Sequence, residues 1–290
     1  MGGGRAEDSR LSTESVAGLV ATVAKCHGAN LTPYDATFLA KCIDARIALT
    51  SSAGAPGYSE LLQRDSEEVQ ALLHSLQIGY SEFFRDALSF ALLERAVLPA
   101  LVRQRSEDGA SEIRIWSAGC SGGQEAYSVA ILLSELAESL DRPVAFRIIA
   151  SDVSEGALAT ARRGQYARGA LGNVRLRQLE RWFSAKGSTY EIVPELRCRV
   201  DFSHYDLLDK DSSCPPASIF GGFDLVLCCN VLIYYRGDAC NAFLEKVGGC
   251  LSPGGYLVTS DSERSIVRKS GGFRAISASA SVFRKLDRRG

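Results

Sequence analysis

The sequence predicts an α/β protein in which a small all-helical domain precedes a larger domain built on a parallel sheet. Three observations support this prediction. Residues 11–105 show helical periodicity and contain no convincing strand run. After residue 110, short apolar runs alternate with helical segments, the pattern of a sheet covered by helices. Within 113–128, an apolar run turns through small residues directly into a helix, a connection typical of open α/β folds.

The amino-terminal part of the chain predicts helices separated by short breaks. Helical periodicity is found near 12–26, 33–49, 58–77 and 87–104. The stretch from Ser51 to Gly57, rich in Ser, Gly and Pro, separates the second of these helices from the third. We therefore predict a flexible tail over 1–10, a helical domain over 11–86, and a linking helix with its linker over 87–110.

The remaining residues, 111–290, predict the α/β domain. The predicted strands are 113–116, 144–150, 223–229 and 255–259, and the predicted helices are 124–139, 154–164 and 237–250. This alternation predicts a parallel sheet with helices on both faces. Residues 165–203 fit the alternation poorly, and Tyr190–Val193 followed by Cys198–Phe202 predicts a small hairpin inserted there.

Composition and charge exclude several classes of protein. The 290 residues carry a formal net charge of −1, so no global field attracts nucleic acid or an anionic membrane. No apolar run approaches the roughly 20 residues of a membrane span, and the start of the chain lacks the apolar core of a signal peptide. We therefore expect a cytoplasmic protein with no membrane insertion and no nucleic-acid partner.

Cysteine and histidine usage argues against disulfides and against a metal site. The nine cysteines form no Cys-x-x-Cys pair and are scattered through apolar segments, which predicts reduced, buried thiols. The three histidines, His27, His74 and His204, are far apart in the sequence, so we expect no metal site.

The loop from Ser117 to Gly123 is the segment most informative about a ligand. It lacks the spacing Gly-x-Gly-x-x-Gly and any Gly-Lys-Ser/Thr, which disfavours dinucleotide and P-loop phosphate sites. Glu125 opens the following helix instead, where negative charge complements the helix dipole but repels phosphate. A cationic ligand without phosphate fits this arrangement, and S-adenosylmethionine, with its ammonium and sulfonium groups, is such a ligand.

Ligands of open α/β sheets lie at the carboxyl ends of the strands, so the residues there are further candidates. Asp152 follows the second predicted strand, and its two oxygens can accept hydrogen bonds from both hydroxyls of a ribose. The alternative is a helix N-cap, because Asp152 and Ser154 both precede a helix. Asn230 follows a later strand and offers both a donor and an acceptor. Tyr234 and Tyr235 come next, and taken alone they favour a wall of packed aromatics.

Five segments occur in an order and at intervals that belong together. They are Phe83-Phe84-Arg85-Asp86, Trp116 to Ser128, Ala150-Ser151-Asp152, Phe223 to Tyr234, and Leu251 to Leu257 with Ser260 to Glu263. In this order they resemble the CheR-type chemotaxis receptor methyltransferases, which methylate glutamates on receptor signalling domains. The resemblance spans about residues 12–286, and it rests on the ordered set because each segment alone is weak.

The resemblance implies a fold, a cofactor and a set of site residues. In that family a helical amino-terminal domain is linked to a Rossmann-like, S-adenosylmethionine-dependent methyltransferase domain, and the linker contributes to the cofactor site. By matching motif, the residues implied to bind the cofactor are Ser81, Arg85, Glu125, Asp152, Asp206, Leu207, Cys229 and Asn230. Among these, Glu125 would hold the methionine part and Asp152 the ribose, while Asp206 and Leu207 would flank the adenine. Arg85 and Tyr234 would line the place of methyl transfer and are the implied catalytic residues.

The implied activity is a protein-glutamate O-methyltransferase that forms methyl esters on the cytoplasmic domains of chemotaxis receptors for sensory adaptation, with S-adenosylhomocysteine as product. A glutamate carboxylate, with a reference pKa of about 4.3, is already ionised near neutrality and needs no general base. Holding donor and acceptor in line with little water would supply most of the acceleration. Arg85 is expected to orient the substrate carboxylate in a fork, and Tyr234 through one hydrogen bond. We expect a monomer.

Two departures from the family pattern concern the cofactor and the substrate. Cys229 stands where the family often has an arginine. The early helix that is rich in arginine in relatives here reads Phe38 to Ile47, with Lys41 and Arg46 as its only cations and Asp44 opposing them. Recognition of an acidic receptor surface is therefore expected to be weaker, or to move to a second cationic cluster that otherwise is an ordinary solvated face. That cluster consists of Arg162, Arg163, Arg168, Arg175 and Arg177.

Two other functions stay open. One is a methyltransferase that acts on a nucleic acid or a small molecule. Amine methylases of nucleic acids usually carry Asn/Asp-Pro-Pro-Tyr/Phe where this chain has Asn230-Val-Leu-Ile, and the near-neutral charge also argues against nucleic acid. The other is a sensor or scaffold module that binds S-adenosylmethionine without transferring its methyl group.

Overall fold

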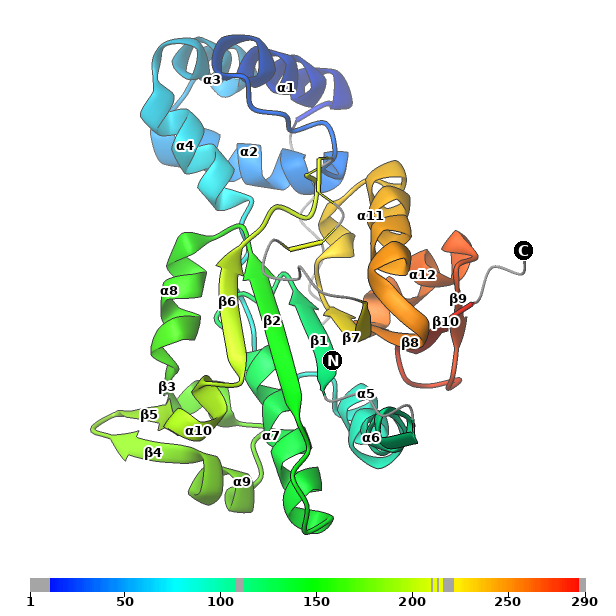
Figure 1. Cartoon of the computed structure of the whole chain (residues 1–290). Coiled ribbons are helices and arrows are strands. Elements are labelled where there is room, and N and C mark those ends of the chain that lie inside the picture. The colour runs from blue at the N-terminus through cyan, green and yellow to red at the C-terminus, as the bar shows by residue number, and fades with distance from the viewer. Residues whose placement is uncertain (1–10, 108–111, 210, 213, 216–221, 287–290) are drawn as a thin grey trace, which may run out of the picture. The chain divides into compact units, whose positions relative to one another are not determined.

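The chain divides into two compact units. One comprises the residues up to Ile78 together with 233–239, and the other comprises 79–232 together with 240–290 (Figure 1). The computed structural model describes residues 11–107, 112–209, 211–212, 214–215 and 222–286. The predicted tail therefore lies outside the described residues, as does part of the predicted linker. The division at Gly79 puts the segment 79–86 in the second unit, whereas the sequence analysis places the domain boundary after residue 86.

The first unit is helical. Its helices are α1 Thr13–His27, α2 Ala36–Thr50, α3 Gly54–Arg64 and α4 Ser66–Ser75. Apolar side chains of all four helices meet in one buried core. The segment 58–77, predicted as one helix, is divided between α3 and α4. The reason is that Asp65 adopts an extended conformation, and its carboxylate accepts hydrogen bonds from the backbone N–H groups of Glu67 and Glu68.

The linking helix predicted over 87–104 is one helical run with an irregular turn. It consists of α5 Ala87–Leu92, the π-helical turn η1 Leu93–Val97 and α6 Leu98–Glu107. Pro99 has no N–H to donate to the carbonyl of Arg95, and its ring would crowd that carbonyl in a regular helix. The wider π turn, which ends at Val97 two residues before Pro99, accommodates this defect without ending the helix.

The second unit contains a seven-stranded sheet with the strand order β6-β2-β1-β7-β8-β10-β9 (Figure 1). The strands are β1 Ile113–Ala118, β2 Phe146–Asp152, β6 Val200–His204, β7 Phe223–Cys228, β8 Leu251–Thr259, β9 Phe273–Ala275 and β10 Val282–Lys285. The first five in this order are parallel, as predicted, but β10 runs antiparallel to both β8 and β9. The four predicted strands all lie in this parallel part, whereas β9 and β10 were not predicted. These two strands pair antiparallel because the connection 276–281 is too short for a parallel crossover.

Helices cover both faces of this sheet, as predicted. They are α7 Gln124–Ser139, α8 Glu155–Arg163, α11 Gly237–Cys250 and α12 Arg264–Ser270. The helix α7 connects β1 to β2 on one side of β1, and α11 connects β7 to β8 on the other side. Because right-handed crossovers in opposite directions place their helices on opposite faces, α7 and α11 cover different faces of the sheet. Adjacent side chains of β1 show this directly. Ile115 lies in the same core cluster as Val129 of α7, whereas the ring of Trp116 lies 6.3 Å from that of Phe243 in α11.

A small three-stranded sheet occupies the predicted insertion. Its order is β3-β5-β4, with β3 Gln165–Ala167, β4 Phe183–Lys186 and β5 Thr189–Ile192. The short helices η2 Arg168–Leu171, α9 Leu176–Trp182 and α10 Pro194–Arg197 lie between or after these strands. The predicted hairpin partner of Tyr190–Val193 was wrong. β5 pairs with β4 across a turn in which Gly187 has φ 60°, and Cys198–Phe202 instead leads into β6 at the edge of the main sheet.

The nine cysteines are free thiols, but only some are buried. Cys120, Cys228, Cys240 and Cys250 are buried, as predicted, whereas Cys26 and Cys198 are exposed, which corrects the expectation of uniformly buried thiols. Within the described ranges, no helix is both long enough and apolar enough to cross a membrane.

Candidate functional site

The loops at the carboxyl ends of the parallel strands meet around β1. The chain proceeds from β1 through β2 to β6 on one side, and then returns to β7 on the other side of β1. Such a reversal of strand order opens the position where open α/β sheets bind ligands. The predicted site residues of the second unit lie in these loops or in the preceding segment 79–86, so the site is built from adjacent strand ends.

The loop after β1 has a backbone shape that requires small residues. Gly119, Ser121 and Gly123 have φ values of 74°, 49° and 85°, in the left-handed region. A β-carbon at Gly123 would lie 2.9 Å from the β-carbon of Ala161, so space as well as conformation requires glycine there. The N–H groups of Gly119 and Cys120 both donate to the carbonyl of Ser151, which ties the loop to the end of β2.

Glu125 lies in the first turn of α7, directly after this loop. Its Oε1 accepts a hydrogen bond of 2.8 Å from the Ser117 hydroxyl, and the Cys229 thiol also hydrogen-bonds to the carboxylate. Burial raises the pKa of Glu125 to about 7, an effect opposed by those two hydrogen bonds. The charge of Glu263 raises this pKa further, and the charge of Arg85 lowers it. A carboxylate in this environment favours a cationic partner, because such a partner stabilises its charged form.

Asp152, at the end of β2, joins two loops. Its Oδ2 accepts from the backbone N–H of Ser121 at 2.8 Å, and its Oδ1 accepts from that of Ser154 at 2.9 Å. The N-cap of α8 is Ser154, so the alternative of an N-cap role for Asp152 itself is wrong. Each carboxylate oxygen has a second lone pair beyond these bonds, which leaves acceptors for the hydroxyls of a ribose.

The turn after β6 carries the two residues predicted to flank adenine. Leu207 is buried and Asp206 is exposed. The backbone N–H of Tyr205 donates to the carbonyl of Asp152, which joins this turn to β2. Lys246 of α11 donates to the Tyr205 hydroxyl at 3.1 Å and to the Leu207 carbonyl at 3.2 Å. Sequence reasoning missed Lys246, because nothing near position 246 indicates a partner about forty residues earlier.

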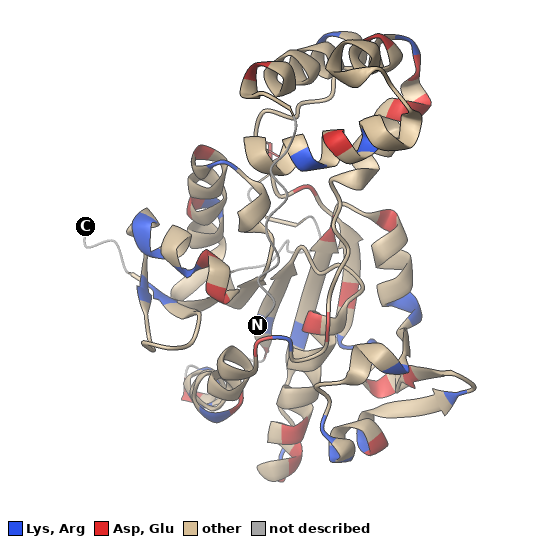
Figure 2. Cartoon of the chain, turned by 180° about the vertical axis from the view of Figure 1, so that it is seen from behind, with Lys and Arg blue, Asp and Glu red and all other residues tan. Residues whose placement is uncertain are grey.

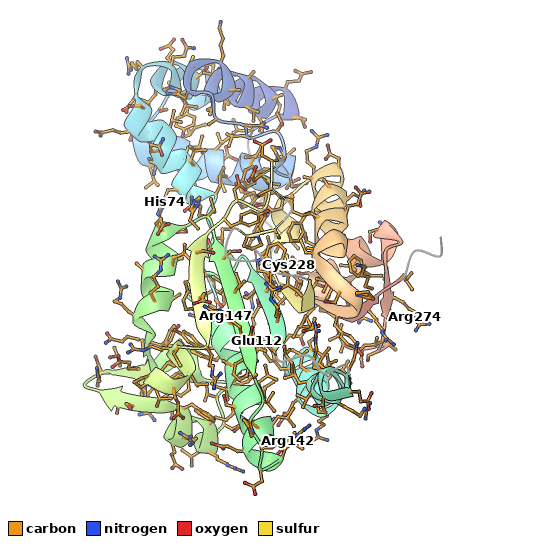
Figure 3. The ribbon with its side chains drawn as sticks, in the orientation of Figure 1. His74, Glu112, Arg142, Arg147, Cys228 and Arg274 are labelled. Atoms are coloured by element: carbon orange, nitrogen blue, oxygen red, sulfur yellow. The ribbon has the colours of Figure 1, made fainter. Side chains whose placement is uncertain are left out.

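The turn after β7 carries Cys229 and Asn230. Figure 3 labels the preceding residue, Cys228, which ends β7. Asn230 has φ 60°, an uncommon conformation for a residue other than glycine. Val231 packs against the loop after β1 so closely that a β-carbon at Gly119 would lie 2.6 Å from its Cγ2. The turns after β1 and β7 are therefore in direct contact.

The segment 79–86 is anchored by its two phenylalanines. Phe83 is fully buried, with its ring 4.9 Å from that of Tyr166 in the small sheet. The backbone N–H of Phe84 donates to the hydroxyl of Ser128 in α7 at 3.1 Å. Arg85 then projects to the exposed side, where its guanidinium lies 5.2 Å from the centre of the Tyr80 ring and donates to the Tyr80 carbonyl.

Ser81 precedes this anchored pair and is half-buried. It lies two residues after Gly79, where a β-carbon would be 3.8 Å from the Ser121 hydroxyl. The start of the segment therefore passes beside the loop that follows β1, which is the neighbourhood that the sequence predicts for Ser81.

Tyr234 belongs to the helical unit and is described there. Its ring lies 4.8 Å from that of Phe38 in α2, and its carbonyl accepts a hydrogen bond of 2.8 Å from the backbone N–H of Asp35. The ring of Tyr235 lies 5.2 Å from that of Tyr34. The alternative of packed aromatics thus describes how these tyrosines are held, and the catalytic role of Tyr234 stays a prediction.

A cavity of about 210 Å³ lies at the opposite ends of the strands. Its lining includes Glu112 and Arg142, labelled in Figure 3, which precede β1 and β2. It is therefore separate from the candidate site. Among the residues that the structure describes, no cluster of three His, Cys, Asp or Glu side chains could hold a metal ion.

Comparison with known families agrees with this geometry. Residues 80–282 match the model described as CheR methyltransferase, SAM binding domain. The chain belongs to the CheR methyltransferase family. Family membership confirms the predicted cofactor, S-adenosylmethionine, the predicted class of enzyme, an S-adenosylmethionine-dependent methyltransferase, and the predicted Rossmann-like α/β fold. The cofactor fits the residues present: a carboxylate for its ammonium group, spare carboxylate lone pairs for its ribose, and a buried leucine for its adenine.

Individual relatives extend the match over both units. Chemotaxis protein methyltransferase 1 of Pseudomonas aeruginosa is 34% identical over 74% of this chain and 78% of its own length. The chemotaxis protein methyltransferase of Listeria innocua is 30% identical over 82% and 85%, respectively. An uncharacterized 104.1 kDa protein of Rhodobacter capsulatus is 33% identical over 89% of this chain, which spans only 26% of that relative.

The structure leaves few cations on α2 for contact with an acidic partner. Lys41, Asp44 and Arg46 lie along this helix, and Figure 2 shows the two signs of charge alternating on it. Arg46 is already paired inside the helical unit, because its Nε donates a hydrogen bond of 2.9 Å to the buried Glu68 carboxylate. Lys41 is the exposed cation of this helix, and the weakening of an acidic-surface contact through α2 stays a prediction.

The second cationic cluster has partners of its own. Arg175 makes a two-bonded ion pair with Glu94, both bonds 2.7 Å long, and Arg162 pairs with Glu155. These pairs lie on the surface of the second unit. They favour the interpretation as a solvated face.

Proposed function

We propose that this protein transfers a methyl group from S-adenosylmethionine to glutamate side chains on the cytoplasmic domains of chemotaxis receptors, forming methyl esters. The observation that carries the proposal is the family match over 80–282, which covers the strand-end loops with Glu125, Asp152 and Asn230. Relatives that match most of the chain are named chemotaxis protein methyltransferases, which supports receptors as the substrate class.

The side chains present suit a carboxylate acceptor. When bound, S-adenosylmethionine supplies an electrophilic methyl group that a glutamate carboxylate accepts without losing a proton, so no general base is required. Two of the histidines, His27 and His74, belong to the helical unit, and His204 is exposed at the end of β6. The strand register sets His204 beside Asp152, a neighbour that its sequence position does not reveal.

Arg85 is proposed to orient the substrate carboxylate and to stay close to the cofactor. Its backbone is held by the buried Phe83 and Phe84, while its side chain is exposed and near enough to Glu125 to lower the pKa of that carboxyl. A positioned but accessible guanidinium can bind a carboxylate in a fork without being locked in an internal ion pair. Tyr234 is proposed to add one hydrogen bond.

The remaining contacts are proposed for binding rather than for chemistry. Glu125 would hold the ammonium group and Asp152 the ribose hydroxyls. Leu207 and Asp206 would flank the adenine, and Cys229 with Asn230 and Ser81 would complete the cofactor contacts. We also propose that the enzyme acts as a monomer without a nucleic-acid partner.

The test is transfer of tritiated methyl from S-adenosylmethionine to receptor-containing membranes, followed by release of labelled methanol in base. We expect base-labile label on the receptor. We also expect Arg85→Ala to lower the rate on the order of a hundredfold, because the acceptor loses its orientation. Arg95→Ala is the matched control, since Arg95 is exposed on the neighbouring helical run and should leave the rate within about twofold.

Each outcome distinguishes the candidate functions. Base-stable label would indicate a different acceptor. Tight cofactor binding without any label would indicate a sensor or scaffold module. Full receptor methylation by Arg85→Ala and Tyr234→Phe would refute the proposed roles of these two residues and leave the overall function in place.

A further inference from the structure

Glu263 is a fully buried carboxylate with an unusually complete set of donors. It ends the short helix η4 Asp261–Glu263, which follows β8, and its exposed fraction is 0%. Its two oxygens accept five hydrogen bonds. The donors are the backbone N–H groups of Asn230, Val231, Leu232 and Ser260, and the hydroxyl of Ser260.

Two of these bonds are local, and three are not. Ser260 and Glu263 form a capping box, in which the side chain of Glu263 accepts from the N–H of Ser260. That motif needs nothing from the end of another strand. The bonds from Asn230, Val231 and Leu232 measure 2.9, 2.7 and 2.7 Å, and they connect η4 to the turn after β7.

These three bonds account for the conformation of the turn. Asn230 has φ 60°. The next two N–H groups, those of Val231 and Leu232, lie at the start of the helical turn η3 Leu232–Tyr234, where no intrahelical acceptor exists for them. Buried N–H groups without acceptors are costly, and a strained backbone persists only where its surroundings over-determine it. One carboxylate accepts hydrogen bonds from three consecutive donors and so fixes the backbone of all three residues.

The turn held in this way faces the candidate cofactor site. Cys229, one residue before it, hydrogen-bonds to Glu125. Val231 fills the space beside Gly119 in the loop after β1. A shift of the turn would therefore displace Asn230. It would also displace Val231, against which the loop after β1 packs.

We propose that Glu263 is a positioning residue for cofactor binding, which sets Cys229 and Asn230 at the end of β7 without touching the cofactor itself. This inference rests on the proposed cofactor contacts of those two residues. No role for Glu263 is predicted from the sequence, because its partners in the turn after β7 lie more than thirty positions away.

The direct test measures binding of S-adenosylhomocysteine by calorimetry in the full chain. Glu263→Gln keeps the size of the side chain but turns an amide N–H₂ toward backbone N–H donors. We expect its Kd to rise at least tenfold. Glu263→Asp keeps the charge on a shorter arm and should rescue part of the loss. In methylation assays the KM for the donor should rise, while the KM for the receptor should stay within about twofold.

Ser260→Ala is the matched control. It removes a donor to the same carboxylate but leaves the three bonds to the turn after β7. We expect a lower Tm with Kd within about twofold of the wild type. An unchanged Kd in Glu263→Gln, or an equal rise in both variants, would overturn the proposal, since the second result would mean general loss of stability.

Hydrogen exchange of the wild-type protein tests the contact whether or not any variant folds. The amides of Asn230, Val231 and Leu232 should exchange slowly, at rates comparable to those of the β7 core, in the absence of ligand. Fast exchange there would refute the positioning role. Failure of the proposed function is distinguishable, because a protein that binds S-adenosylhomocysteine but never methylates receptors leaves the binding and exchange results unaffected.

Discussion

Glu125 is a carboxylate that burial holds close to its titration point at neutral pH. Its pKa is about 7 in the structure, and only its ionised form attracts a cation. Affinity for S-adenosylhomocysteine should therefore rise with pH through 7 and then level off. From pH 7.5 to pH 5.5 we expect Kd, measured by calorimetry, to increase about twentyfold. Glu138→Gln, on the exposed far end of α7, should show the same profile. A flat profile in the wild type would contradict this assignment.

The same shift predicts a conflict between stability and binding. The folded-state pKa of Glu125 lies above its unfolded value, so its contribution to folding falls as the pH rises from about 4.5 through 7. Glu125→Gln removes the half-buried charge and should raise the free energy of unfolding of the unliganded protein at pH 8 by about 1–3 kcal/mol. It should also abolish detectable cofactor binding. Urea denaturation at pH 8 and pH 5 checks the sign, and a destabilised variant at pH 8 would refute the argument.

The candidate site residues that could be predicted from the sequence are those placed by their own strand or helix. Glu125 and Asp152 could be proposed from the sequence because Glu125 opens the helix after the loop that follows β1 and Asp152 ends β2, and strand ends are where such sheets bind ligands. Lys246 and Glu263 could not, since each acts on a turn of another element more than thirty positions earlier. Ser117 was missed for a different reason: it hydrogen-bonds to Glu125, but a serine at a strand end carries no distinctive pattern.

At the scale of elements, the loop after β1 should be the least tolerant of added bulk. Gly123 has φ 85°, and a β-carbon there would contact both Ala161 and Phe202 at about 3 Å. Gly123→Ala should therefore lower the free energy of unfolding by about 2–4 kcal/mol, because backbone strain and overpacking add. Gly169→Ala, where no atom lies within 4 Å of the added carbon, should change it by less than about 1 kcal/mol. Equal urea midpoints for the two variants would disprove the steric account.

Long periodic elements were predicted well and short ones were not. The helices α7 and α11 agree with the predicted ranges, because their amphipathic patterns extend over several turns. The short helices α9, α10 and α12 and the strands β9 and β10 have too few residues to show a period, and tertiary contacts decide their structure. The division of 58–77 at Asp65 shows the same limit, since one capping side chain overrides a continuous apolar pattern.

At the scale of the whole molecule, charge should contribute little to recognition of an acidic receptor. The chain has 33 Lys and Arg against 34 Asp and Glu, so its net field is weak, and on α2 the exposed Lys41 stands beside an Arg46 already paired with Glu68. Steering by such a surface depends only weakly on salt. Between 50 and 300 mM NaCl, we expect kcat/KM for receptor methylation to change less than about threefold. Lys41→Glu should lower it by a similarly small factor. A fall of more than tenfold with salt would instead require a strongly cationic docking surface. Charge reversal at Arg163, Arg168 and Arg177, the members of the second cluster for which the structure shows no ion pair, would then test where that surface lies.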